Sequence, residues 1–176
     1  MEKLRKVVNQ KVDLKILTSN YINESVIKWY SDEDVIKYSE NQYRKINLVN
    51  QIEYVESCYR SNTEFLYGIL SDGQYIGNIL LSNISKNHKT AELSYLIGDK
   101  NFWGKGIITE AINLIIKIAI NHLKLRKLYA GVCSENIGSI KALEKNNFVK
   151  EGIRIKHLYL DSRFHDQIDY GLLLIK

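Results

Sequence analysis

Two glycines, Gly104 and Gly106, stand on either side of Lys105, immediately before the longest apolar helical pattern in the chain. Glycine lets the backbone approach a ligand closely because no Cβ intervenes. The first N–H groups of a helix have no partner within it, and together with the helix dipole they attract an anion. The stretch therefore predicts a phosphate-binding turn. The same glycines could equally end the preceding strand, and a Gly-x-Gly pair alone does not decide between the two.

Other chemistries find little support in the sequence. Ile107 and Ile108 follow Gly106 where a P-loop needs Lys and Ser or Thr, and no third glycine completes G-x-G-x-x-G. The four histidines lie far apart, and Cys58 and Cys133 form no C-x-x-C pair. We expect neither a metal site nor a disulfide, and an inert Cys133 buried in a strand.

Length and composition indicate one globular unit. The chain has 176 residues, of which 45% are hydrophobic, and we expect a single domain over 1–176. A net charge of +5 and scattered tyrosines do not indicate a nucleic-acid partner. The first ten residues lack the apolar run of a signal peptide, and Glu110 and Lys117 interrupt the most apolar segment. We therefore expect a cytoplasmic protein with no membrane contact, either a monomer or a homodimer.

Hydrophobic periodicity places these residues on elements. Asp72-Gly73 suits a tight hairpin turn because both residues tolerate positive φ. The pattern predicts strands at 11–17, 64–71, 74–84, 89–98, 127–133, 148–160 and 167–175, and helices at 23–39, 47–61, 105–123 and 136–146. This order indicates a mixed α/β fold around one central sheet.

Residues 91–120 and 127–152 together resemble the GNAT superfamily of acetyl-CoA-dependent N-acetyltransferases. The resemblance is strongest to the branch that contains RimJ/RimL-like ribosomal-protein acetyltransferases and amino-sugar acetyltransferases of surface-polysaccharide clusters. Two motifs carry it. Q/R-x-x-G-x-G/A appears as Asn101, Gly104 and Gly106, and N-x-x-S/A with E-K-x-G-F appears as Asn136, Ser139, Glu144, Lys145 and Phe148. Asn101 replaces Gln or Arg, and Asn147 replaces a glycine, which asparagine can do at positive φ.

The resemblance implies a mostly antiparallel sheet flanked by helices, whose central strands 89–98 and 127–133 splay apart to admit the pantetheine arm. It implies that acetyl-CoA is the cosubstrate, with no metal. The residues implied to bind it are Tyr95, Leu96 and Ile97 in the first strand, Asn101, Gly104, Lys105, Gly106, Ile107 and Thr109 at the turn, and Asn136, Ser139 and Lys141 on the next helix. Lys105 and Lys141 would contact the outer phosphates, although surface lysines are often merely solvated.

Acyl transfer to an amine needs a group that removes a proton from the ammonium. Glu92, in the middle of an apolar strand, is the leading candidate, and we expect its carboxylate to be partly desolvated. The alternative is that Glu92 faces outward on a polar side. Many relatives place a tyrosine where this chain has Leu143, so Ser139 is the better candidate to assist the leaving thiolate, unless it only caps or packs.

The acceptor is a small-molecule amine or a protein N-terminus. Tyr38, Tyr43 and Arg44 lie in one short loop that suits a sugar ring and a nucleotide diphosphate, whereas the acidic residues of 32–40 would suit a peptide ammonium. His165, in an expected turn, is a further acceptor-facing candidate. We favour a nucleotide-linked amino sugar, with a protein N-terminus as the alternative. A non-catalytic acetyl-CoA sensor and a nucleic-acid-binding module are the other classes of protein considered.

Overall fold

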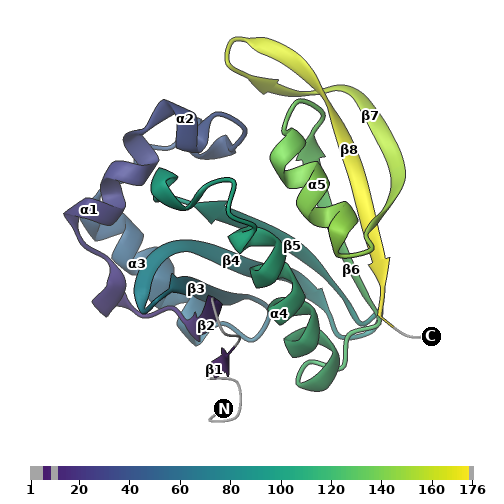
Figure 1. Cartoon of the computed structure of the whole chain (residues 1–176), viewed down its shortest axis with the longest axis horizontal. Coiled ribbons are helices and arrows are strands. Elements are labelled where there is room, and N and C mark those ends of the chain that lie inside the picture. The colour runs from purple at the N-terminus through teal and green to yellow at the C-terminus, as the bar shows by residue number, and fades with distance from the viewer. Residues whose placement is uncertain (1–5, 9–11, 175–176) are drawn as a thin grey trace.

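The computed structural model describes residues 6–8 and 12–174, and these form one eight-stranded sheet in the order β1-β2-β3-β4-β5-β6-β8-β7 (Figure 1). The strands are β1 (Lys6–Val8), β2 (Val12–Ile16), β3 (Phe65–Ser71), β4 (Gln74–Ser85), β5 (Thr90–Ile97), β6 (Lys127–Cys133), β7 (Val149–Leu160) and β8 (Arg163–Leu173). Every neighbouring pair is antiparallel except β5 and β6. The expected mixed α/β fold with a mostly antiparallel sheet is confirmed.

Helices cover both faces of the sheet. The α-helices are α1 (Glu24–Ile27), α2 (Glu33–Ile36), α3 (Leu48–Arg60), α4 (Ile107–Asn121) and α5 (Ile137–Lys145), and short 3-10 turns include η3 (Lys28–Ser31), η4 (Glu40–Tyr43) and η5 (Lys100–Phe102). Successive strand residues point to opposite faces. Ile79 of β4 packs in the cluster beneath α4 and α5, whereas Leu80 packs against the cluster that α3 buries on the other face.

The two central strands part after a short parallel contact. Strand β5 pairs with β6 only from Thr90 to Glu92, where Glu92 lies opposite Tyr129. From Leu93 to Ile97, β5 remains paired with β4 alone. One backbone edge of this part of β5 therefore faces the opening, with N–H and C=O groups that no strand of the described sheet uses. The splayed arrangement implied by the sequence resemblance is present (Figure 1).

One expected helix is broken into pieces. Residues 23–39 carry apolar residues at helical spacing, yet the structure has α1, η3 and α2 there. Asp32 interrupts the segment because it adopts an extended conformation and caps α2, accepting a hydrogen bond from the Asp34 N–H. The start of the predicted first strand, residue 11, lies outside the described residues, and β1 had not been expected from the sequence.

Tyr67 of β3 offers a test of the core. Its side chain is fully buried, its hydroxyl has no hydrogen-bond partner among the described residues, and burial raises its pKa to about 12. An unsatisfied buried hydroxyl costs roughly 1–3 kcal/mol. Tyr67→Phe should therefore raise the free energy of unfolding, by about 1 kcal/mol, in a urea titration. Tyr170→Phe is the control and should lower it, because the Tyr170 hydroxyl bonds Glu144 at 3.0 Å. A destabilised Tyr67→Phe would contradict the expectation.

Candidate active site

The glycine turn before α4 has the shape that the phosphate-binding hypothesis requires. Gly104 and Gly106 have φ of 71° and 78°, and Gly106 is the residue that caps α4. A Cβ built on either glycine would meet no atom within 4 Å. The turn is therefore open, and its positive φ values favour glycine. The unbonded N–H groups of the first turn of α4 face this space, so the residues fit a pyrophosphate.

The residues around the turn divide into exposed side chains and structural ones. Asn101 lies in η5 and is exposed, and the Lys105 ammonium lies 5.4 Å from the centroid of the Phe102 ring. Ile107 is buried in the core, so only its backbone can serve a ligand. The carbonyl of Thr109 accepts a hydrogen bond from the side chain of Asn146, the last residue before the positive-φ Asn147. Asparagine thus replaces the family's glycine at the conformation expected.

Helix α5 presents its N-terminus to the opening between β5 and β6. Asn136 caps the helix through its Oδ1, which accepts the Ser139 N–H at 3.1 Å, and its Nδ2 group is left to donate elsewhere. The capping role thus belongs to Asn136 and not to Ser139. Leu143, at the position where many relatives have a tyrosine, is buried in the core and cannot donate a proton. Lys141 is exposed, as a contact to an outer phosphate would require.

Tyr95 spans the opening. Its hydroxyl donates to the carbonyl of Ser139 at 3.4 Å, and burial raises its pKa to about 12. Two residues on, the carbonyl of Ile97 accepts the indole N–H of Trp103 at 3.0 Å. These contacts place the Tyr95–Ile97 stretch between α5 and the glycine turn. The three strand residues expected to face the cosubstrate therefore lie beside the other expected residues.

Glu92 sits where β5 and β6 separate, on the same side of β5 as Ser94. It is half-buried, and its Oε2 accepts a hydrogen bond of 2.7 Å from Asn83. Asn83 reaches it from an irregularity in β4, where its φ is 51°. Asn83 thus gives the Glu92 carboxylate one polar partner within the sheet. Because two residues along a strand span about 7 Å, Glu92 lies about that far along β5 from Ser94.

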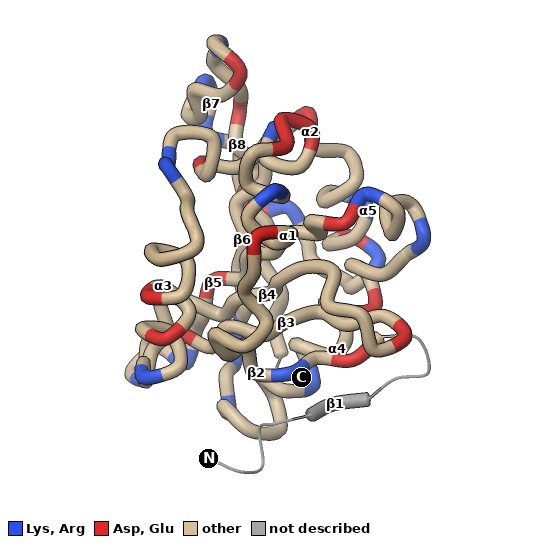
Figure 2. Tube along the Cα trace, turned by 90° about the vertical axis from the view of Figure 1, so that its left-hand side faces the viewer, with Lys and Arg blue, Asp and Glu red and all other residues tan. Residues whose placement is uncertain are grey.

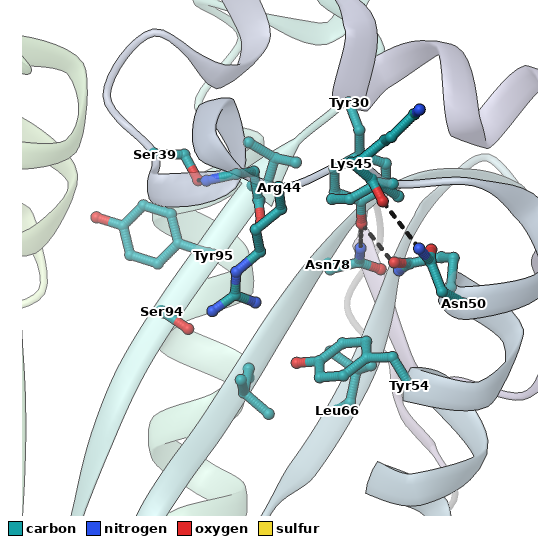
Figure 3. A pocket seen from close by; sticks show the side chains of 15 residues that line it. Tyr30, Ser39, Arg44, Lys45, Asn50, Tyr54, Leu66, Asn78, Ser94 and Tyr95 are labelled. Carbon is teal, nitrogen blue, oxygen red and sulfur yellow. Dashed lines mark hydrogen bonds between the residues drawn. The ribbon is translucent and has the colours of Figure 1, made fainter. Parts of the chain in front are cut away.

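A cavity of about 300 Å³ opens on the face of the sheet opposite α4 (Figure 3). Ser94, Tyr95 and Leu96 form its edge at the splayed strand. Its other lining residues are Tyr30, Ser39, Asn41, Arg44, Lys45, Ile46, Asn50, Gln51, Tyr54, Leu66, Asn78 and Leu80. Figure 3 shows the Arg44 side chain extending into the cavity, whereas the Lys45 side chain extends away from it. The cavity thus reaches the strand at the stretch where the cosubstrate is expected.

A network of neutral groups forms the inner wall of the cavity. The Tyr30 hydroxyl lies 3.2 Å from Gln51 Nε2 and 3.1 Å from Asn78 Nδ2, and both amide groups donate to it. The Tyr75 hydroxyl donates to Asn78 Oδ1. With two donors on its oxygen, the Tyr30 hydroxyl can direct its own proton into the cavity. Sequence reasoning missed these residues, although Asn78 within an apolar strand was a visible signal.

Of the four residues expected at the acceptor site, only Arg44 lines the cavity. Tyr38 stacks beneath the Lys37 ammonium at 5.5 Å, and the Tyr43 hydroxyl donates to the carbonyl of Tyr159. His165 lies in β8 and not in a turn. Its ring is buried, with Nε2 3.0 Å from the Leu160 carbonyl and Nδ1 3.2 Å from Glu135. The structure therefore corrects the location expected for His165.

The acidic segment of α2, red in Figure 2, is partly neutralised. The Lys100 ammonium lies 2.7 Å from Asp32 and 3.0 Å from Asp34, and it lowers the pKa of Asp32. None of the acidic residues at 32–40 lines the cavity. Two of the four carboxylates considered for a peptide ammonium are thus already paired, and they tie α2 to η5.

Within the described part of the chain, no group of three or more His, Cys, Asp or Glu side chains could hold a metal ion. Cys58 and Cys133 are buried and free, and burial raises the pKa of both thiols. None of the helices formed by residues 12–174 has the length and apolarity to cross a membrane.

The splayed strands and the glycine turn form one side of a candidate site, and the cavity that reaches β5 forms the other. The sequence matches the Acetyltransferase (GNAT) domain over residues 14–149, which is more than half of the chain. The chain therefore belongs to the GNAT acetyltransferase family.

Two relatives from this family carry names that differ in whether they specify a substrate. The chain is 38% identical over 117 residues to the probable N-acetyltransferase YjcK of Bacillus subtilis (strain 168). The matched region covers 65% of this chain and 64% of that protein. It is 36% identical over 106 residues to the putative ribosomal N-acetyltransferase YdaF of the same organism, and that matched region covers 60% of this chain and 57% of YdaF. The matched region thus spans about three fifths of the length of these two relatives.

Solved structures show the same fold. A probable acetyltransferase superposes with a TM-score of 0.85 at 25% identity, over 96% of both chains. Spermidine N-acetyltransferase from Vibrio cholerae, in complex with CoA and spermine, superposes with a TM-score of 0.84 at 21% identity, over 94% of this chain and 97% of that one. The second likeness concerns the fold alone.

Proposed function

We propose that the chain transfers the acetyl group of acetyl-CoA directly to a primary amine, in a complex that holds both substrates. One observation carries the proposal: Ser94, Tyr95 and Leu96 of the stretch of β5 that has left β6 line the cavity, and Trp103, next to the glycine turn, donates its indole N–H to the Ile97 carbonyl at the end of that stretch. Acetyl-CoA would supply the thioester. Backbone N–H groups of β5 on the open edge would stabilise its carbonyl oxygen, and Asn136 would bond the pantetheine arm.

Glu92 is the base that we propose for the amine. Because Ser94 and not Glu92 lines the cavity, we expect the proton to reach the carboxylate through water. Ser139, at the first turn of α5, would hydrogen-bond the leaving thiolate. Family membership and the CoA-bound relative of the same fold support the choice of cosubstrate.

We propose a nucleotide-linked amino sugar as the acceptor, and a protein N-terminus, as in the RimJ/RimL-like branch, as the second candidate. The cavity offers aromatic faces and neutral hydrogen-bonding groups, which suit a sugar ring with hydroxyls. The name of the relative YdaF favours the ribosomal alternative. Against a peptide, Lys100 already pairs with Asp32 and Asp34, two of the four acidic residues that would attract its ammonium.

A thiol-release screen tests the proposal. Nucleotide-activated amino sugars, polyamines and short N-terminal peptides are offered at equal concentration with acetyl-CoA, and kcat/KM is compared. We expect the amino sugars to exceed the peptides by about tenfold or more, which is roughly 1.4 kcal/mol of transition-state preference. Peptides that exceed the sugars by that factor would exclude the sugar assignment.

The same screen separates the other classes of protein. Acetyl-CoA binding without thiol release for any amine would identify a sensor and reject the proposed activity. A nucleic-acid-binding module would show affinity that collapses with added salt and does not respond to acetyl-CoA.

A further inference from the structure

None of the described residues that line the proposed acceptor cavity carries a carboxylate. Its charged lining residues are Arg44 and Lys45, and the remaining polar side chains are hydroxyls and amides. An ammonium group other than the reacting amine would find no counter-charge on this wall, and it would meet the Arg44 guanidinium instead. The cavity is therefore poorly matched to a polyamine, even though a protein of the same fold was solved with spermine bound.

Arg44 differs from the other described arginines in having no protein partner for its guanidinium. Arg60, Arg154 and Arg163 each contact a carboxylate, and Arg126 donates to a backbone carbonyl. No hydrogen bond or ion pair joins the Arg44 side chain to the described part of the chain. Figure 3 shows that this side chain points inward, toward the side of the cavity formed by Ser94 and Tyr95.

The backbone on both sides of Arg44 is fixed, so the inward direction is not that of a loose loop. The Asp161 N–H at the tip of the β7–β8 hairpin donates to Gln42 Oε1 at 3.2 Å, and the Tyr43 hydroxyl donates to a carbonyl of β7. On the other side, the Lys45 carbonyl accepts a hydrogen bond of 2.8 Å from α3. The backbone that carries Arg44 is thus fixed beside the cavity before any ligand arrives, which lowers the entropy that this loop loses on binding.

We infer that the acceptor amine also carries an anionic oxygen group, a carboxylate or a phosphate, and that this group binds the Arg44 guanidinium. A guanidinium binds two oxygens of either group with parallel hydrogen bonds, which neither a hydroxyl nor an ammonium can match. The Tyr30 hydroxyl adds a neutral donor on the same cavity wall. The inference rests on the proposed function, and it narrows the acceptor class of the same site.

Binding is measured first, on the wild-type protein saturated with CoA so that the glycine turn cannot capture the probe. Two matched series are titrated by calorimetry: glucosamine, glucosamine 6-phosphate and glucosaminuronic acid, and propylamine, 3-aminopropylphosphonate and β-alanine. In at least one series we expect an anionic member to bind about tenfold or more tightly than the neutral parent, as charge-assisted bonds imply. Within a series, the phosphorus acid and the carboxylate show which anion the site prefers.

Arg44→Gln is the test variant, and Arg60→Gln is its matched control, because it removes the same charge from an exposed arginine outside the cavity. We expect Arg44→Gln to remove the preference for the anionic member and to leave the neutral parent within about twofold. Arg60→Gln should keep the wild-type preference. Thiol release with the same compounds and spermidine gives a second readout.

The inference is overturned if no anionic compound binds more tightly than its parent, if spermidine has the highest kcat/KM, or if Arg44→Gln keeps the anion preference. Loss of the preference in Arg60→Gln as well would also overturn it, since it would show a long-range charge effect. The proposed activity fails separately, by an absence of thiol release. The binding data still decide the role of Arg44 in that case, because they require no turnover.

Discussion

Gly104→Val and Gly106→Val are each expected to weaken acetyl-CoA binding by about 100-fold or more, measured by calorimetry. Each glycine has positive φ, and the space beside it is open to a ligand. A branched side chain would occupy the position from which backbone N–H groups reach the pyrophosphate, and it would strain the turn. Hydrogen bonds to charged groups contribute roughly 1.5–3 kcal/mol each, so losing two accounts for the factor.

Gly73→Val is the matched control for this experiment. Gly73 has φ of 81° in the β3–β4 turn, and a Cβ there also meets nothing within 4 Å. The variant therefore carries the same backbone strain away from the site. We expect it to lose stability but to bind acetyl-CoA as the wild type does. Wild-type affinity in a folded Gly104→Val and Gly106→Val would remove the phosphate-binding assignment.

Much of the fold could be predicted because burial leaves a periodic pattern. The predicted strand at 127–133 has the bounds of β6, and the predicted helix at 105–123 contains α4. Asp72 and Gly73 both have the positive φ expected for the hairpin turn. These elements pack one apolar face on the sheet, or are buried on both faces, so their sequences record the packing.

The segment 23–39 shows where periodicity was insufficient. Its apolar spacing is helical, but Asn23 and Asp32 both cap, and each starts a separate short helix. Capping side chains compete with the helix backbone for its hydrogen bonds, and here that local competition decided the structure. The strand β1 of three residues is too short to leave a readable pattern.

The two sides of the candidate site differed in how far they could be predicted. The residues proposed for the cosubstrate lie in a few short segments, and the two glycines among them share one turn before one helix, where both have positive φ. The acceptor cavity gathers single residues from distant segments, such as Tyr30, Gln51, Asn78 and Ser94. No spacing along the chain links these four. Only the antiparallel register of β4 and β5 and the packing of α3 bring them together.

We expect Glu92→Gln to lower kcat by about 100-fold and to leave acetyl-CoA affinity unchanged, which is the usual scale for removal of a general base. Glutamine keeps the shape and can still accept the hydrogen bond from Asn83, but it cannot take the proton of the amine. Ser139→Ala should cost less, about tenfold, because a thiolate is already a tolerable leaving group. Thiol release is measured with the best acceptor from the screen, and the pH–rate profile is recorded from about pH 5 to about pH 10.

Three comparison variants decide whether Glu92 acts as the base. Glu53→Gln, on the exposed side of α3, removes a carboxylate outside the cavity and should keep the wild-type rate. Glu92→Gln should lose the acidic limb of the pH–rate profile, whereas Ser139→Ala should retain it, because only the base must be deprotonated to work. Asn83→Ala probes the same carboxylate from its partner's side and should alter that limb with a smaller loss of rate. A wild-type profile in Glu92→Gln would mean that the amine enters the site already neutral and that Glu92 only supports the separation of β5 and β6.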